Sequence, residues 1–88
     1  MKKKSIKMNI LGHIWTIKFG NPGPNRDALC DYETRVITLR RKSNGSLLNC
    51  LSHEIIHARC RDLDEEAVED LGNLIDEAHV KVVMNLLV

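Results

Sequence analysis

Two histidines and a glutamate stand close together in the stretch His53-Glu54-Ile55-Ile56-His57, which has the pattern H-E-x-x-H. On a helix, residues four apart lie one turn above each other, so both imidazoles can reach a single metal ion. A zinc ion with three protein ligands keeps a fourth position for water and lowers the pKa of that water toward about 7. Glu54 would take the proton of that water, so the motif predicts zinc-dependent hydrolysis of a peptide bond. The alternative is a solvated His-Glu-His face on an ordinary helix.

Such a site needs a third protein ligand, and the residues after the motif offer several. The extended pattern with a third histidine is absent, because Cys60 stands at its glycine position and Leu63 at its histidine position. The acidic residues within reach are Asp64, Glu65, Glu66 and Glu69. On a helical wheel Glu66 and Glu69 point away from the apolar stripe, whereas geometry leaves the choice between Asp64 and Glu65 open. Cys60 is a weaker candidate, since it lies on the same rigid helix as the histidines.

Other side chains capable of metal binding or catalysis are expected to be structural. His13 lies in a predicted strand, and His79 lies far along the last predicted helix. Tyr32 has a hydroxyl that could donate to an oxyanion, but a tyrosine in a strand more often serves packing. Cys30 and Cys50 are interpreted as small buried apolar residues.

The H-E-x-x-H motif falls within a predicted helix over residues 47–61, with Ser46 as its cap. The apolar residues of this segment share one face at helical spacing; they are Leu47, Leu48, Leu51, Ile55 and Ala58. His53 and His57 are then expected nearly opposite that face, with Glu54 to one side. The helix would therefore pack by one side and present its imidazoles on the other.

The part of the chain before this helix has the pattern of strands. Residues 6–19 alternate apolar and polar side chains, and Gly12 marks either a bulge or a turn where the alternation changes phase. Residues 20–25 contain two glycines and two prolines, which predicts a loop. A second strand pair is predicted at residues 29–32 and 35–39, with a turn at 33–34 and another turn at 42–45. The expected fold is α+β, with a small antiparallel sheet packed on the two helices.

A last helix is predicted to run from a cap at Asp62 or Asp64 toward Val88. Its apolar stripe consists of Val68, Leu71, Leu74, Ile75 and Ala78. Beyond Val80 the apolar residues surround the helix on nearly every side. Because exposed apolar surface of this kind usually marks an interface, the sequence predicts a homodimer through the C-terminal helix. The alternative is a frayed tail, or one folded back over the sheet.

Composition limits the remaining possibilities. The chain has 88 residues, which predicts a single domain over 1–88, and its net charge of +1 gives no electrostatic support for nucleic-acid binding. No window approaches the roughly 20 apolar residues that a membrane span needs. Residues 8–19 are too polar for a signal peptide, and the odd count of three cysteines does not suggest a disulfide framework. The cytoplasm is therefore the expected compartment.

The stretch from Leu29 to Asn73, half of the chain, resembles short phage- and prophage-encoded proteins similar to zinc-peptidase domains of the ImmA/IrrE type and other minimal gluzincin-like peptidases. The segments that carry the resemblance are "LCDYETRVITL", "LLNCLSHEIIHA" and "LDEEAVEDLGNLI". The resemblance implies a minimal zincin-like fold with His53 and His57 as zinc ligands and Glu54 as general base. It favours Glu65 as the acidic ligand, with Glu66 and Asp64 close behind.

Two functions follow as hypotheses. The first is a zinc endopeptidase of narrow specificity, which cuts another protein in the cytoplasm of a bacterial or phage-infected cell. The resemblance implies that an edge strand at residues 35–39 would bind an extended peptide beside the metal. The second is a peptidase-like zinc-binding module that acts by protein–protein binding without catalysis. Glu54 favours the enzyme, because a purely structural zinc site has no use for a base beside the ion.

Overall fold

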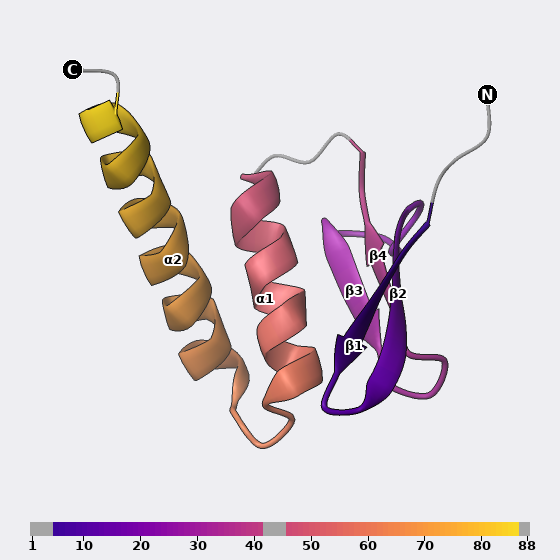
Figure 1. Cartoon of the computed structure of the whole chain (residues 1–88). Helices are drawn as coiled ribbons and strands as arrows, with labels where there is room; N and C mark the ends of the chain where they lie inside the picture. The colour runs from indigo at the N-terminus through magenta and orange to yellow at the C-terminus, as the bar shows by residue number, and fades with distance from the viewer. Residues whose placement is uncertain (1–4, 42–45, 87–88) are drawn as a thin grey trace.

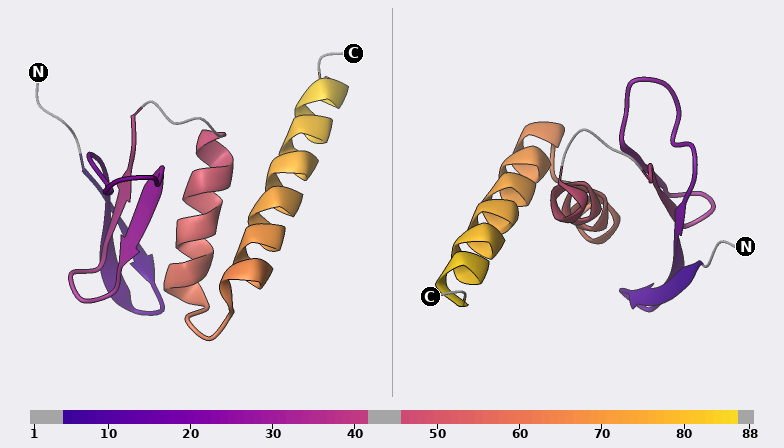
Figure 2. Two further views of the ribbon diagram at one scale, coloured as in Figure 1. Left: turned by 180° about the vertical axis from the view of Figure 1, so that it is seen from behind. Right: turned by 90° about the horizontal axis from the view of Figure 1, so that it is seen from above.

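Four strands and two helices form three layers in the computed structural model, which describes residues 5–41 and 46–86. The elements are β1 (Ile6–Ile10), β2 (His13–Phe19), β3 (Ala28–Asp31), β4 (Val36–Leu39), α1 (Leu47–Arg59) and α2 (Glu65–Leu86). The strands make one sheet, α1 lies against it, and α2 lies on the far side of α1 (Figures 1 and 2). The turn predicted at 42–45 and the last two residues of the predicted C-terminal helix lie outside the described residues.

The sheet is mixed, which corrects the antiparallel sheet expected from the sequence. Its strand order is β1-β2-β4-β3, and the central pair β2–β4 is parallel, whereas β1–β2 and β3–β4 are antiparallel. After β2 the chain first forms the outer strand β3. It then turns back, and β4 takes the place between β3 and β2. Alternation of apolar residues specifies which face of a strand is buried, but it does not specify the neighbour or its direction.

The free edge of the sheet beside α1 also differs from the expectation. Residues 35–39 were expected to form an edge strand, but β4 lies between β2 and β3. The edge strand is therefore β3, and it is the strand that α1 approaches most closely (Figure 1). The hairpin itself is confirmed, with Cys30 paired to Ile37 across β3 and β4.

The ambiguity at Gly12 is resolved in favour of a turn between two strands. Leu11 and Gly12 have φ angles of 54° and 83°, and Ile10 pairs with His13 across the turn. Positive φ at both central residues is the geometry of the two-residue hairpin turn that suits twisted strands. The Gly12 amide donates to Asn9 Oδ1 at 2.8 Å, which helps hold the turn.

The hydrophobic core lies between the sheet and α1. Alternate strand residues supply most of it, and the buried set is Ile10, Trp15, Ile17, Ile37, Leu39 and Ala58. Ile17 of β2 and Ile37 of β4 are paired across the parallel strands, so the buried side chains of both strands lie on the same face of the sheet. Leu51 and Ile55 of α1 are packed against this core, as the helical spacing predicted.

Both helices begin where the sequence indicated. Ser46 caps α1, since its hydroxyl accepts a hydrogen bond from the Asn49 amide at 3.1 Å, although the helix ends at Arg59, two residues earlier than predicted. Asp64 caps α2, because its Oδ1 accepts from the Ala67 amide at 2.8 Å. The predicted apolar face of α1 is only partly correct, since Leu47 at its start is 52% exposed.

Candidate metal centre

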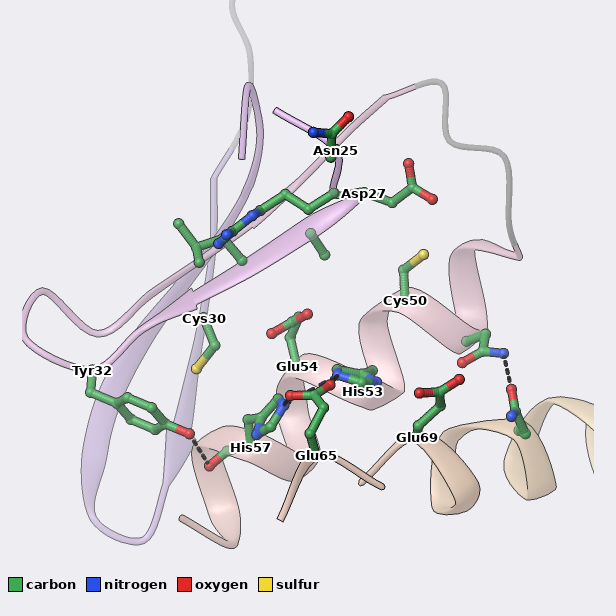
Figure 3. Close-up of a pocket in the computed structure, with 15 residues that line it drawn as sticks. Asn25, Asp27, Cys30, Tyr32, Cys50, His53, Glu54, His57, Glu65 and Glu69 are labelled. Carbon is green, nitrogen blue, oxygen red and sulfur yellow. Dashed lines mark hydrogen bonds and ion pairs between the residues drawn. The ribbon is translucent and has the colours of Figure 1, made fainter. Parts of the chain in front are cut away.

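His53, His57 and Glu65 come together at the surface between α1 and α2 (Figure 3). His53 Nε2 lies 2.6 Å from Glu65 Oε1, and His57 Nε2 lies 3.1 Å from Glu65 Oε2. The two imidazole Nε2 atoms are 3.1 Å apart. The three side chains therefore converge on a single point, with one donor atom available from each.

The local fold explains why these three residues meet. His53 and His57 are one turn apart on α1, so their rings lie on the same side of the helix. The chain then reverses within residues 60–64, where the Cys60 amide donates to the Ile56 carbonyl and the Leu63 amide donates to the Cys60 carbonyl. Glu65 is the first residue of α2, so this reversal brings its carboxylate directly opposite the imidazoles.

The donor set and its geometry fit a zinc ion. Two imidazole nitrogens and one carboxylate oxygen are a ligand set that catalytic zinc sites use, with an open fourth position. Tetrahedral bonds of about 2.0–2.1 Å place neighbouring donor atoms about 3.3 Å apart; two of the separations here, at 3.1 Å, are close to this value, and the third, between His53 and Glu65, is shorter at 2.6 Å. The histidine side chains are only 20% and 18% exposed, whereas Glu65 is 67% exposed, so the group is accessible from one side.

The other candidates for the third ligand have different positions. The carboxylate of Asp64 caps α2, so this residue has a structural role that does not involve a metal. Glu66, Glu69 and Cys60 are not part of the converging group within the described residues. Cys60 instead ends α1 as its C-cap residue. Among the acidic residues considered from the sequence, Glu65 is the one that the structure brings to the histidines.

Glu54 lies to one side of the two histidines, as the helical spacing predicted (Figure 3). Its burial was not predicted, since its side chain is on the face toward the sheet and the residue is 8% exposed. No hydrogen bond or ion pair of its carboxylate is found in the described part of the chain, and no fully buried side-chain oxygen there lacks a partner, so its oxygens are accessible from the cleft. Burial raises the pKa of Glu54 above its ordinary value, and the two neighbouring histidines oppose that rise. Largely burying a carboxylate costs free energy, so the presence of Glu54 beside the histidines requires an explanation.

A cleft of about 650 Å³ contains Glu54 and the converging group. The edge strand β3 and the loop before it form one wall, α1 forms the floor, and the first turns of α2 form the other wall (Figure 3). The lining residues are Asn25, Arg26, Asp27, Ala28, Leu29, Cys30, Tyr32, Asn49, Cys50, His53, Glu54, His57, Glu65, Glu69 and Asn73. The sheet edge thus faces the three convergent side chains across an open groove.

The spacing between α1 and α2 is fixed by contacts that sequence reasoning did not anticipate. Asn49 donates to Asn73 at 2.7 Å, and Ser46 donates to Asp76 at 2.8 Å. A Cβ on Gly72 would lie 3.0 Å from Asn49 Oδ1, so the helices approach closely at this glycine. The signal in the sequence was the glycine inside a helical pattern, which often marks a close approach to another element.

The remaining residues considered from the sequence have structural positions. Tyr32, at one end of the cleft, donates its hydroxyl to the His57 carbonyl at 3.0 Å and so supports the end of α1. Cys30 lies in the cleft wall, where burial raises the pKa of its thiol to about 12. Cys50 also lines the cleft, half-buried. His13 lies outside the cleft, and His79 is exposed on α2.

Comparisons of this chain with protein families, with curated proteins and with solved structures find no match. Within the described residues, no helix combines the length and the apolar character needed to cross a lipid bilayer. The functional argument therefore rests on the chemistry of the cleft.

Proposed function

We propose that this chain is a zinc-dependent metallopeptidase of narrow specificity, with a minimal zincin-like fold, that acts on a protein in the cytoplasm of a bacterial or phage-infected cell. The observation that supports this best is Glu54, a carboxylate that is 8% exposed and opens into the same cleft as three convergent metal-binding side chains. A structural metal site needs the three ligands but has no use for this fourth group.

The residues that would hold the ion are His53, His57 and Glu65. Their donor atoms are those that zinc prefers at catalytic sites, and their separations are compatible with one shared ion. When bound, zinc would supply a Lewis acid that polarises a carbonyl group and lowers the pKa of a coordinated water. The partial burial of both histidines would keep competing solvent away from one side of the site.

The chain's own residues would bind the substrate and move the proton. Within the described residues, the edge strand β3 has no strand neighbour on the side of the cleft, so its backbone groups would be available to an extended peptide. Glu54 would accept a proton from water at its carboxylate oxygen and return it to the nitrogen of the departing amine. Because Glu54 lines the cleft, that oxygen would be accessible to water and substrate for both transfers.

A second candidate function is a zinc-containing binding module without catalysis. One observation favours it: the Tyr32 hydroxyl, which lines the cleft and could in principle donate to an oxyanion, is already bonded to the His57 carbonyl. In this alternative the cleft would still bind an extended segment of a partner protein along β3, but no bond would be cut.

The substitution Glu54→Gln tests the proposal, with Glu66→Gln as the matched control. Both changes remove one carboxylate, but Glu66 is exposed and lies outside the cleft. Each variant would be loaded with zinc and incubated with a mixture of denatured bacterial proteins, and new protein N-termini would be measured by mass spectrometry. We expect Glu54→Gln to retain zinc and to lose activity by about 100-fold or more, because the proton acceptor is gone.

The control should cut at the wild-type rate. Equal cleavage by wild type and Glu54→Gln would show that the mechanism is wrong. Zinc binding without new N-termini in any of the three proteins would favour the binding module.

A further inference from the structure

A second cavity, of about 380 Å³, lies at the end of the sheet near the end of α1. Its apolar lining is part of the core: Ile10, Trp15 and Ala58 are 6%, 5% and 6% exposed. His13, Arg35 and Arg61 also line it. We call this cavity the basic pocket.

The charged residues that line the basic pocket are all basic. No acidic residue lines it within the described part of the chain. Arg61 lies over the Tyr32 ring at 4.2 Å from its centroid, and no hydrogen bond or ion pair involves its guanidinium among the described residues. No hydrogen bond or ion pair involves the side chains of His13 or Arg35 among the described residues. Three cationic or hydrogen-bonding groups therefore surround an apolar floor without a counter-ion.

The backbone at Arg35 adds an independent observation. Its φ angle is 56°, in the left-handed region, and its carbonyl accepts from the Thr16 amide at 2.9 Å, which ties it to β2. Asparagine or glycine holds this conformation with less strain than arginine does. An arginine at such a position is best explained by what its side chain binds.

We propose that the basic pocket binds a carboxylate carried on an apolar group. The two guanidinium forks match the two oxygens of a carboxylate, and the Ile10–Trp15–Ala58 floor suits an aliphatic or aromatic body. A free small carboxylate and the C-terminal residue of a peptide both have this chemistry. The inference does not rest on the proposed peptidase function, since none of the three metal-site residues lines the pocket.

The pocket nevertheless shares a wall with the cleft. Tyr32 lines both cavities, and its hydroxyl is bonded to the backbone of His57. Arg61 lies over the ring of Tyr32, the residue that supports the end of α1, so a ligand bound to Arg61 would lie next to Tyr32. A peptide that follows β3 beyond Asp31 would likewise reach this pocket.

Trp15 provides a direct readout, because it is the only tryptophan of the chain and lies in the pocket. The full chain would be titrated with N-acetyl-leucine, with N-acetyl-leucinamide and with inorganic phosphate while tryptophan fluorescence is followed. We expect a saturable change with N-acetyl-leucine alone. An equal response to the amide would overturn the role of the carboxylate, and an equal response to phosphate would overturn the role of the apolar group.

Substitutions would locate the effect. Arg61→Gln and Arg35→Asn should each weaken binding of N-acetyl-leucine roughly tenfold, because each removes a charged hydrogen-bond donor. Arg35→Asn also suits the left-handed backbone, so the fold should persist. Arg59→Gln, an exposed arginine outside the pocket, is the control for net charge. A loss of affinity as large in Arg59→Gln, or no saturable change in wild type, would contradict the proposal.

A peptide arm distinguishes the two sources of the carboxylate. A five-residue peptide that ends in leucine would be compared with free N-acetyl-leucine, both titrated against wild type and against Glu69→Ala, which alters the cleft wall but not the basic pocket. If the natural ligand is the C-terminal carboxylate of a peptide, the peptide should bind more tightly than N-acetyl-leucine. It should lose that advantage in Glu69→Ala. Equal affinities in both proteins would assign the pocket to a small free carboxylate. Failure of both ligands to bind would overturn the proposal.

Discussion

The two helices are joined by a short turn but differ greatly in how much of their surface is covered. α1 lies between the sheet and α2, so its residues are held from two sides (Figure 2). Among the described elements α2 is packed mainly against α1, and Val68 and Gly72 are its buried residues. The candidate metal centre uses the covered helix for its two histidines and only the first residue of the other helix. Precise placement of side chains thus coincides with the densely packed part of the molecule.

The remainder of α2 is long and exposed. It has 22 residues, about 33 Å of helix, compared with 13 residues in α1, and its C-terminal end extends past the start of α1 (Figure 1). Eight of the thirteen exposed large apolar side chains in the described residues lie on it: Leu71, Leu74, Ile75, Val80, Val82, Val83, Met84 and Leu86. The apolar surface predicted from the sequence is therefore present, whereas the homodimer that it suggests stays a prediction.

The largest effect should come from removing the histidines on the covered helix. His53→Ala or His57→Ala should abolish binding of one zinc ion per chain and lower the free energy of unfolding. Ligand binding stabilises the folded state by about 4 kcal/mol when the free metal exceeds its dissociation constant a thousandfold, and this contribution would be lost. Zinc content by elemental analysis and thermal unfolding would measure both effects, with His79→Ala on the exposed helix as control. Equal zinc content in all four proteins would rule out the site.

The same measurements separate the neighbouring carboxylates at the start of α2. Glu65→Ala should weaken zinc retention, whereas Asp64→Ala should retain zinc and lose about 1 kcal/mol of stability through its cap. Glu66→Ala and Glu69→Ala should leave zinc content unchanged. Loss of zinc in Asp64→Ala, with Glu65→Ala unaffected, would move the assignment by one residue.

A smaller effect is expected where the two helices meet. Gly72→Leu would force a side chain against Asn49 and should lower the free energy of unfolding by about 1–3 kcal/mol. Asp70→Leu, at an exposed position of the same helix, is the control and should change stability by less than about 0.5 kcal/mol. Denaturant unfolding of both variants would measure the difference. Similar values for the two variants would mean that α2 is not docked at Gly72.

The smallest effect on stability is expected at the uncovered end of α2. A chain that ends at His79 should keep zinc binding and nearly the full free energy of unfolding, because the deleted residues are not part of the core. It should, however, lose the predicted self-association. Light scattering at micromolar concentration would compare it with the full chain, which we expect to be dimeric. Monomers in both samples would exclude the dimer.

Local features of this fold were accessible from the sequence. The helix with the H-E-x-x-H motif, its Ser46 cap and the hairpin of β3 and β4 follow from short-range patterns, and the structure confirms them. Glu65 was favoured by the resemblance, whereas geometry alone had left Asp64 equally eligible. The structure separates them because one carboxylate caps the helix and the other faces the histidines.

Long-range features were not accessible. The parallel pairing of β2 with β4 depends on the path of the loop between hairpins, which alternation does not encode. The burial of Glu54 was missed because a helical wheel was drawn from apolar residues alone. The covered face of α1 is centred near Ala58 and includes Glu54, so a polar residue occupies a core-facing position. Such a departure from apolar patterning is what a functional site produces.

The position of Glu65 at the very start of α2 has a consequence for kinetics. Its carboxylate is held by a reversal of the chain at residues 60–64 and by a helix whose main contacts are with α1, so brief undocking of α2 would withdraw one donor while both imidazoles stay in place. Under the proposed zinc binding, the lifetime of the ion in the protein would then be set by the opening rate of this joint. Metal exchange with a chelator would report on the same motion as amide hydrogen exchange in the first turn of α2.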